Sequence, residues 1–324
     1  MKILVTGGCG FIGSHFLHYM IDKYNDYEFV CLDALTYAGN YKNIESLLEN
    51  KNFKFIHGNI CDKELVNNLF INEKFDIVVN FAAESNVDHS IENPSLFYET
   101  NVIGTLCLLE ACVMMNDIYK IKRFHQVSTD EVYGDIPLCS KFRGFKESSL
   151  LKPSSPYSSS KASADLLVMS FSRTFNLDVS ISRTCNNYGP SQHDDKLIPI
   201  VIEKCLHNED IPVHGSGLYQ REWIYVLDNV RAIDLIIHNE CKSKIYNVGS
   251  GVIKSNMDIV KFIVKVLKGK SKICHVEDRK GQDLKYKIDS SKIKEEFGFK
   301  CNCDFNEYLM KTILCYNENK VDKE

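Results

Sequence analysis

Tyr157 and Lys161 stand four positions apart in a stretch that two prolines introduce and that has the pattern of a helix. This spacing places both side chains on one face of the helix, one turn apart. The positive charge of the lysine, together with that of any cationic group bound beside it, would lower the pKa of the phenol, so that a tyrosinate could take a proton near neutral pH. Because Tyr-x-x-x-Lys is also a common coincidence on helices, the rest of the chain decides its meaning.

Thr129, Asp130 and Glu131 follow the strand-like run 124–128. Two neighbouring carboxyl groups held in different environments can divide the roles of general acid and general base between them. Such a pair is often only a solvated loop on the protein surface. The end of a central parallel strand, however, is where ligands bind in open α/β sheets, so we predict a catalytic role for this segment.

Gly7, Gly10 and Gly13 form a Gly-x-x-Gly-x-x-Gly motif that directly follows a strand-like run at residues 3–6 and opens a helical pattern. Glycines at these places allow a tight turn and a close approach of the backbone to a pyrophosphate, which the free N–H groups at the helix start bind. The alternative is a turn that merely packs the helix on the strand. Asp33, twenty residues beyond the motif, favours dinucleotide binding instead.

Asp33 ends the next strand-like run and determines which dinucleotide is expected. Its carboxylate would accept hydrogen bonds from the adenosine ribose hydroxyls and repel a 2′-phosphate. Residues 34–39 contain no Arg or Lys that would attract such a phosphate, so NAD is favoured over NADP. Asp62 either contacts the adenine or caps the helix that begins there.

Short β-branched runs alternate with amphipathic segments of helix length, and these elements must position the residues above. The rhythm predicts an α/β fold, with a Rossmann-type, doubly wound parallel sheet covered by helices on both faces. From 182 to 245 the pattern loosens into loops rich in Pro and Gly, and helices are then expected at 257–267 and 305–316. We therefore expect a smaller, mixed α/β C-terminal lobe. The strands are expected at residues 3–6, 29–32, 53–57, 77–81, 124–128, 179–182 and 245–248.

The composition is that of an ordinary globular protein of 324 residues. With 39 Lys and Arg against 43 Asp and Glu, the formal charge is −4, which leaves no basic footprint for nucleic acid. No run approaches the roughly 18 apolar residues of a membrane span, and the N-terminus has no signal-peptide pattern, so we expect a cytoplasmic protein without a membrane partner. The 13 cysteines are scattered without a Cys-x-x-Cys pair, which predicts free thiols and no metal site.

The glycine motif, Thr129, Tyr157 and Lys161 together resemble the extended short-chain dehydrogenase/reductase superfamily, whose active site is a Ser or Thr, a Tyr and a Lys. Thr129-Asp130-Glu131 resembles one branch of it, the nucleotide-sugar 4,6-dehydratases, and above all those acting on dTDP-glucose. Segments 33–40 and 81–88 are similar to that branch's cofactor loop and to its segment along the nicotinamide ribose and the sugar. The NAD-binding residues that we expect are Gly7, Gly10, Phe11, Ile12, Gly13, Asp33, Ala34, Leu35, Thr36, Asn59, Ile60, Phe81, Ala82, Ala83, Ser85, Thr100, Tyr157, Lys161 and Asn187.

Two further segments, 185–190 and 196–199, resemble the branch's contacts to sugar and diphosphate, and Arg221 stands where it has a diphosphate-binding arginine. Near the C-terminus the chain departs from the branch: Lys280 and Gln282 replace a Pro and a His, Lys285 replaces an Arg, and Val252 stands where an Asn is common. These departures leave UDP-glucose as a competitor of dTDP-glucose. The substrate-binding residues that we expect are Ser85, Thr129, Asn186, Lys196, Leu197, Pro212, His214, Arg221, Asp278 and Arg279.

The resemblance implies an internal redox cycle on tightly bound NAD. Tyr157, helped by Lys161, removes the C4 hydroxyl proton while the C4 hydride passes to NAD, and Thr129 orients the C4 oxygen. Glu131 then takes the C5 proton while Asp130 protonates the departing C6 hydroxyl. The hydride returns to C6 and Glu131 returns a proton to C5, which yields a 4-keto-6-deoxy-glucose nucleotide.

Two rival functions share this architecture. A UDP-sugar 4-epimerase or decarboxylase would need no acid for a C6 hydroxyl, so Asp130 and Glu131 argue against it. A non-catalytic NAD-binding scaffold would have no reason to keep Thr129, Tyr157 and Lys161.

The resemblance also implies a domain division and an assembly. We expect an NAD-binding domain at residues 1–184, to which about 226–250 return, and a nucleotide-sugar lobe mainly at 185–324. Relatives usually form homodimers through a four-helix bundle, for which residues 94–115 and 157–175 are the candidates by analogy.

Overall fold

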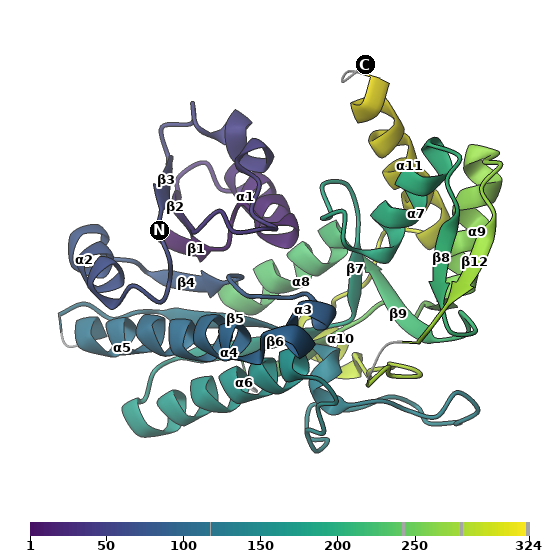
Figure 1. The fold of residues 1–324 in the computed structure, drawn as a ribbon. Helices are drawn as coiled ribbons and strands as arrows, with labels where there is room; N and C mark the ends of the chain where they lie inside the picture. The colour runs from purple at the N-terminus through teal and green to yellow at the C-terminus, as the bar shows by residue number, and fades with distance from the viewer. Residues whose placement is uncertain (117, 242–243, 279–280, 322–324) are drawn as a thin grey trace.

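A computed structural model describes the chain except residues 117, 242–243, 279–280 and 322–324, and the side chains of 319–321. Within the described residues, seven parallel strands form the central sheet in the order β10-β6-β5-β4-β1-β2-β3 (Figure 1). The order reverses between β1 and β4, as a doubly wound sheet requires. The strands are β1 (Lys2–Thr6), β2 (Glu28–Asp33), β3 (Phe53–His57), β4 (Ile77–Asn80), β5 (Arg123–Thr129), β6 (Val179–Thr184) and β10 (Ile245–Val248).

All seven strands predicted from the β-branched runs are present, with ends that differ from the predicted ones by at most two residues. Their side chains alternate between two apolar clusters because neighbouring residues of a strand face opposite sides. In β1, Ile3 and Val5 belong to one cluster, whereas Leu4 belongs to the other. The sheet is therefore buried on both faces, which explains the continuous apolar runs.

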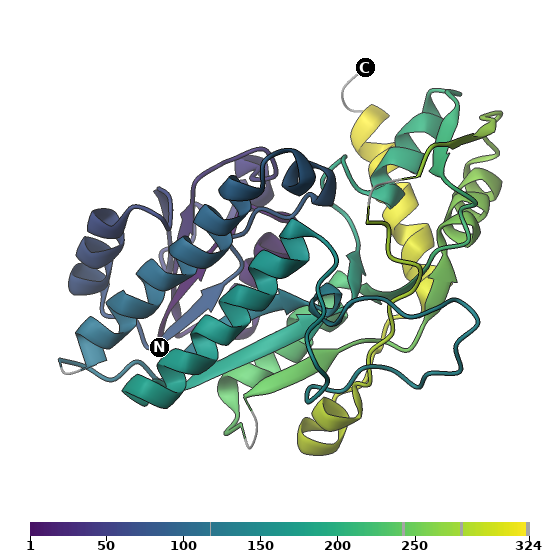
Figure 2. The same ribbon diagram turned by 60° about the horizontal axis from the view of Figure 1, so that its bottom comes forward.

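Helices cover both faces of the sheet. α1 (Phe11–Lys23) and α8 (Val226–His238) pack against each other on one face, and α2 (Lys63–Glu73), α5 (Thr105–Asn116) and α6 (Pro156–Phe175) cover the other. Figures 1 and 2 show α5 and α6 running side by side. The predicted helix at 94–115 is α4 (Pro94–Tyr98), a π-helical segment (Glu99–Gly104) and α5 in succession.

One helical stretch, Pro94–Asn116, is long and apolar enough to cross a membrane by length and composition alone, which the sequence reading did not anticipate. Half of its most apolar window is buried inside the structure, as in the core helix of a soluble protein. It is therefore weak evidence for a membrane span.

The C-terminal part is smaller and mixed, as predicted. β7 (Asn186–Tyr188), β9 (Gln220–Tyr225) and β11 (Ile253–Ser255) form a sheet in which β7 and β9 are parallel and β9 and β11 antiparallel. β8 (Ile211–His214) pairs with β12 (Ile273–Val276). Three helices pack around these sheets: α7 (Leu197–Leu206), α9 (Asn256–Leu267) and α11 (Phe305–Val321).

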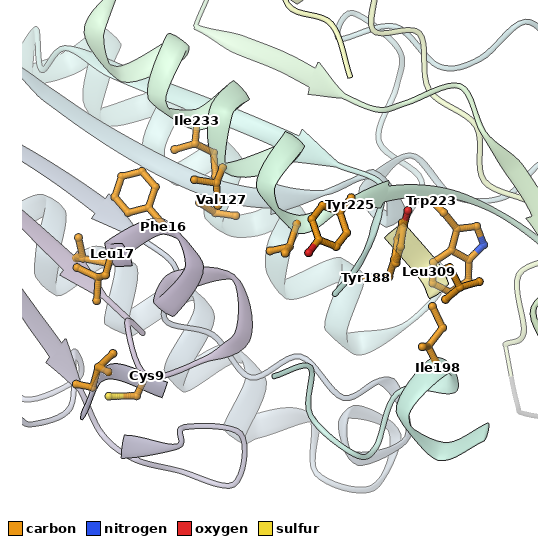
Figure 3. Packing of buried hydrophobic residues seen from close by; sticks show 14 of the residues in the cluster. Cys9, Phe16, Leu17, Val127, Tyr188, Ile198, Trp223, Tyr225, Ile233 and Leu309 are labelled. Carbon is orange, nitrogen blue, oxygen red and sulfur yellow. The ribbon is translucent and has the colours of Figure 1, made fainter. Parts of the chain in front are cut away.

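The expectation of loops from 182 to 245 is wrong for much of that stretch, because β7, α7, β8, β9 and α8 lie within it. By contrast, the helices expected at 257–267 and 305–316 are present as α9 and α11. One apolar cluster runs from the sheet into this smaller part; Figure 3 shows it extending from Phe16 and Ile233 to Trp223 and Leu309. The two parts therefore share a continuous core.

Candidate active site

A cavity of about 510 Å³ lies where the carboxyl ends of β1, β4, β5 and β6 meet the smaller C-terminal part. Ligands bind at this edge in open α/β sheets. All five predicted catalytic residues line it: Thr129, Asp130, Glu131, Tyr157 and Lys161.

The glycine turn between β1 and α1 is closely packed. Gly7 has φ +69°, and a Cβ there would lie 2.6 Å from the Ala82 backbone nitrogen. A Cβ on Gly13 would lie 2.3 Å from the Gly7 carbonyl oxygen, so neither position admits a side chain. α1 begins after Gly10 without a side-chain cap, which leaves its first N–H groups available for an anion.

Asp33 is buried at the end of β2, beside this turn. Its two carboxylate oxygens accept hydrogen bonds of 2.8 Å from the backbone N–H groups of Cys9 and Leu35. Burial raises the pKa of Asp33, and these two bonds act in the opposite direction. Leu35 does not line the cavity, contrary to the prediction: its side chain packs against the core, and its backbone N–H holds Asp33.

The other predicted NAD-binding residues surround the same cavity. Gly58, Tyr37 and Glu84 line it too and were not predicted. Asp62 caps α2 through its side chain, which accepts a hydrogen bond from the Leu65 N–H at 3.0 Å. The predicted residues on the lining are Gly7, Gly10, Phe11, Ile12, Gly13, Asp33, Ala34, Thr36, Asn59, Ile60, Phe81, Ala82, Ala83, Ser85, Thr100, Tyr157, Lys161 and Asn187.

α6 presents Tyr157 and Lys161 to the cavity from its first two turns. Pro156 stands at its start, and Ser155 caps it in a capping box with Ser158. The Lys161 ammonium donates a 2.7 Å hydrogen bond to the Val127 carbonyl oxygen in β5. Burial lowers the pKa of Lys161 to about 8.

The pKa of Tyr157 is raised well above its ordinary value, first by burial and then by the negative charge of Glu131. A hydrogen bond with the Thr129 side chain lowers it, but does not outweigh these effects. The protein by itself therefore does not lower the pKa of Tyr157 in the way that the sequence led us to expect. A lowered pKa would require a cationic nicotinamide close to the phenol.

Thr129, Asp130 and Glu131 lie where β5 ends and a 3₁₀ turn (Asp130–Tyr133) begins. The Thr129 hydroxyl caps this turn by accepting a 3.2 Å hydrogen bond from the Glu131 N–H. Asp130 is 2% exposed, and its Oδ2 has no hydrogen-bond partner among the described residues. Burial, followed by the charges of Glu131 and Glu222, raises the pKa of Asp130 well above its ordinary value. Glu131 is only half-buried, so the two carboxyls do occupy different environments.

The substrate side of the cavity is built by β7, β8, β9 and the start of α7. Lys196 donates a 3.2 Å hydrogen bond to the Ser85 carbonyl oxygen across the cavity. Arg221 donates to the Asp283 carbonyl oxygen at 3.0 Å, and its guanidinium lies 4.3 Å from the centre of the Tyr286 ring. Predicted residues lining this side are Ser85, Asn186, Lys196, Leu197, Pro212, His214 and Arg221.

Asp278 does not line the cavity, so the prediction that it binds substrate is not supported by its position. Its carboxylate accepts a hydrogen bond from the Tyr219 hydroxyl instead. Arg279 lies outside the described residues.

Several lining residues were not predicted, above all Asp283 and Tyr286. The buried Asp283 carboxylate accepts hydrogen bonds from the hydroxyls of Ser154 and Tyr286. The sequence predicted no role for either residue, although the neighbouring Gln282 and Lys285 are positions where the chain departs from the branch that it resembles. His193 and Asp195, 3.0 Å apart between Nδ1 and Oδ1, also line the cavity. In the described part of the chain, no group of three or more His, Cys, Asp or Glu side chains could hold a metal ion.

The family model described as GDP-mannose 4,6 dehydratase matches residues 4–312. The chain belongs to this family. A dTDP-glucose 4,6-dehydratase of Escherichia coli is 39% identical over 99% of this chain and 94% of the relative. The low-salt glycan biosynthesis protein Agl12 of Haloferax volcanii is 46% identical over 91% of this chain and 92% of the relative.

Solved structures of the same family have the same fold. A dTDP-glucose 4,6-dehydratase of Streptomyces venezuelae, crystallised with NAD and TYD bound, has a TM-score of 0.93 and 40% identity, covering 99% of this chain and 98% of its own. A UDP-glucose 4-epimerase of Thermotoga maritima, with a TM-score of 0.89 and 30% identity, covers 99% of this chain and 100% of its own. By identity, this epimerase is more distant than the dehydratase.

Proposed function

We propose that this protein is an NAD-dependent hydro-lyase that converts dTDP-glucose into dTDP-4-keto-6-deoxy-glucose and water. The observation that carries the proposal is the pair Asp130 and Glu131, which lines one cavity together with Thr129, Tyr157 and Lys161. An epimerisation at C4 would use Thr129, Tyr157 and Lys161, but it includes no step in which a protonated Asp130 would act as an acid. The similarity to named dTDP-glucose 4,6-dehydratases over nearly the whole chain supports the same reaction.

The residues present fit NAD. Gly7 and Gly13 leave a cradle that a Cβ would fill, and the uncapped start of α1 faces it. Asp33 would hold the adenosine ribose, and Thr100 and Asn187 line the cavity farther along. When bound, NAD accepts a hydride from C4 of the sugar and later supplies one to C6. Crystal structures of family members hold NAD, which supports this assignment.

Tyr157 would act first, as the base that takes the proton of the C4 hydroxyl. Thr129, which interacts with the Tyr157 hydroxyl, would hold the C4 oxygen in line for that transfer. Lys161 is anchored to Val127 in β5, so its ammonium stays one helical turn from the phenol and stabilises the phenolate.

Asp130 and Glu131 would carry out the elimination of water from C5 and C6 of the sugar. Burial raises the pKa of Asp130 well above its ordinary value and so favours its protonated form, which would protonate the C6 hydroxyl as it leaves as water. Glu131 would take the C5 proton, which the C4 ketone has made acidic, and later return it. Their contrasting burial divides the roles in the order that the reaction requires.

The similarity to named dTDP-glucose 4,6-dehydratases favours dTDP over the alternative, UDP. Of the departures from the dTDP-glucose branch, Gln282 lines the cavity, Val252 and Lys285 do not, and Lys280 lies outside the described residues. Val252 and Lys285 are therefore not placed to contact a substrate in this cavity. Six lining residues remain available to bind the nucleotide sugar: Asn186, Lys196, Leu197, Pro212, His214 and Arg221.

The test is to incubate the purified protein separately with dTDP-glucose and UDP-glucose without added reductant, and to measure product mass and the alkali-induced absorbance of 4-keto sugars. We expect the loss of one water from dTDP-glucose, with the larger kcat/KM for that substrate. A larger kcat/KM for UDP-glucose would assign the alternative nucleotide. No water loss from either, with NAD demonstrably bound, would contradict the dehydratase.

We also infer that the protein is a cytoplasmic homodimer with an NAD-binding domain at 1–184 and a sugar-nucleotide lobe mainly at 185–324. The free state of its 13 cysteines supports a reducing compartment. Exposed apolar side chains on α4 to α6 support a helical interface with a second copy, and they include Leu96, Ile103, Met114, Leu166 and Phe175.

A further inference from the structure

Glu222 is a buried carboxyl that the mechanism above leaves without a role. It lies in β9, is 1% exposed and does not line the cavity. Its two oxygens accept hydrogen bonds from the backbone N–H groups of Gly251 at 2.7 Å and Ile288 at 3.2 Å. A Cβ on Gly249 would lie 2.3 Å from Glu222 Oε1, so a residue with a side chain at this position would clash with the carboxyl.

The strand register places Glu222 near Asp130. Thr129 at the end of β5 pairs with Thr184 at the end of β6, so Asp130 and Cys185 each follow directly after a residue of this pair. Asn186 in β7 pairs with Trp223 in β9, so Cys185 and Glu222 each directly precede a residue of that pair. Cys185 is 2% exposed and feels the charge of both carboxyls. Asp130, Cys185 and Glu222 therefore form one row, in which Asp130 and Cys185 line the cavity and Glu222 does not.

The two buried carboxyls differ in what surrounds them. Glu222 has two N–H donors, and hydrogen bonds from N–H groups favour the charged form of a carboxyl. Asp130 Oδ2 has no partner among the described residues, so a charge on it would be poorly stabilised. When two close carboxyls compete, one takes the charge and the other keeps a proton. Burial raises the pKa of both carboxyls, but the two N–H donors oppose this rise at Glu222, whereas Asp130 accepts only a 3.4 Å hydrogen bond from the Thr129 hydroxyl, and its pKa is raised well above its ordinary value. Of the two carboxyls, Glu222 is therefore the one that takes the charge.

Other charged groups around the row do not reverse this assignment. Burial and the negative charges raise the pKa of Asp130 despite the opposing charge of Arg221. Lys287 favours the charged form of Glu222. The titratable and charged groups that act on either carboxyl are Glu131, Tyr157, Cys185, Arg221, Lys287 and Cys301.

We propose that Glu222 is a positioning residue: as a carboxylate sealed behind Asp130, it keeps the Asp130 carboxyl protonated and ready to give its proton to the leaving C6 hydroxyl. The proposal rests on the proposed dehydratase function, in which Asp130 is the acid. Glu222 touches neither the sugar nor the cofactor and acts only through Asp130.

The experiment compares the wild-type protein with Glu222→Gln, each labelled with ¹³C at the aspartate carboxyls. The Asp130 resonance is assigned from Asp130→Asn and followed against pH with NAD present. Because a neutral residue 222 no longer repels charge on Asp130, the midpoint of the Asp130 titration should fall by about one pH unit. An unchanged midpoint would overturn the proposal. This readout needs no turnover, so it is independent of whether dTDP-glucose is the substrate.

A kinetic arm separates this role from a merely structural one. In Glu222→Gln the high-pH limb of kcat should move to lower pH, with a loss of roughly tenfold above the limb and little loss below it. A loss of equal size at every pH would show that Glu222 only supports the fold. If the wild type dehydrates neither sugar nucleotide, the proposed function fails, while the titration still decides the part played by Glu222.

Should Glu222→Gln not fold, Glu222→Asp provides the second variant. It keeps the charge but withdraws it by one methylene from Asp130, so the titration midpoint should fall by less than one pH unit. A folded Glu222→Asp protein with an unshifted midpoint would contradict the proposal.

Discussion

Asp130 and Glu131 are neighbours in the chain, but the protein surrounds them differently. Both residues line the cavity, but Asp130 is 2% exposed, whereas Glu131 is half-buried. Removing a carboxyl from water disfavours its charged form, so burial alone separates an acid from a base in adjacent residues. Both residues lie in the 3₁₀ turn that Thr129 caps.

Replacing Glu131 by Gln removes the base for the C5 proton and leaves the C4 oxidation in place. We expect enzyme-bound reduced nicotinamide to accumulate when dTDP-glucose is added, while kcat for product falls by roughly 10²- to 10⁴-fold. Absorbance of the reduced nicotinamide measures the first result and product mass the second. Glu45→Gln, a substitution of an exposed glutamate outside the cavity, is the control and should turn over normally. Full turnover by the Glu131 variant would remove Glu131 from the mechanism.

Residues within one short motif were predictable, whereas residues brought in by distant segments were not. Gly7, Gly13 and Asp33 could be placed because one turn and its two flanking strands fix them. Asp283 and Tyr286 could not, since they reach the cavity only through contacts with Ser154 and Arg221, far away in the sequence. Leu35 was misjudged because a loop residue can serve through its backbone N–H alone.

At the scale of elements, the strands of the central sheet were predictable because each is buried on both faces and shows a continuous apolar run. β7 and β11 have three residues each, and β8 contains Pro212, so neither length nor pattern distinguishes them from loops. They are strands because β9 and β12, from other parts of the chain, pair with them. Such pairing is a tertiary effect that local sequence does not contain.

α1 and α8 are joined by a network around the buried Asp234. Its carboxylate accepts hydrogen bonds from the hydroxyls of Tyr19 at 3.1 Å and Tyr24 at 2.9 Å, and it pairs with Lys23 and His238. Burial alone would raise the pKa of Asp234, but hydrogen bonds from His238, Lys23 and Tyr24 outweigh it and lower the pKa to about 2. The network therefore stabilises the fold above the ordinary aspartate pKa of 3.8, and this stabilisation is lost as the pH falls through about 2.

Asp234→Asn should lower the free energy of unfolding at neutral pH by about 2 kcal/mol, because the charged partner of the network is lost. The difference between variant and wild type should shrink as the pH is lowered through the window between 3.8 and about 2. Denaturant unfolding over a pH series measures both results. Asp22→Asn, at an exposed position near the end of the same helix α1, serves as the control. A difference that does not vary with pH would contradict the role of the Asp234 charge.

At the scale of the whole molecule, one continuous apolar core joins the sheet to the smaller C-terminal part, and the cavity lies where they meet. Arg221 and Tyr286 from the smaller part line this cavity together with Tyr157 and Asp130 from the part that holds the central sheet. On the outside, α4 to α6 carry apolar side chains that nothing covers in the single chain.

Charges placed on those helices should dissociate the proposed dimer. Leu166 is 63% and Ile103 49% exposed, and Leu166→Asp together with Ile103→Asp would bury two carboxylates in an apolar interface. We expect a dissociation constant at least roughly 30-fold weaker, measured by sedimentation equilibrium. Ile71→Asp is a matched control, because Ile71 is 50% exposed but lies on α2. Unchanged dimerisation of the double variant, or a monomeric wild type, would contradict this interface.

The central claim is that a single protein-bound NAD takes the hydride from C4 of the sugar and returns it to C6 within one turnover. The most direct measurement uses dTDP-glucose carrying deuterium at C4, with unlabelled NADH added to the solution, and locates the label in the product by mass spectrometry and NMR. The account predicts a product that has lost one water and carries the deuterium at C6, with no hydrogen from the added NADH. A product without deuterium at C6, or one that keeps it at C4, would contradict the account.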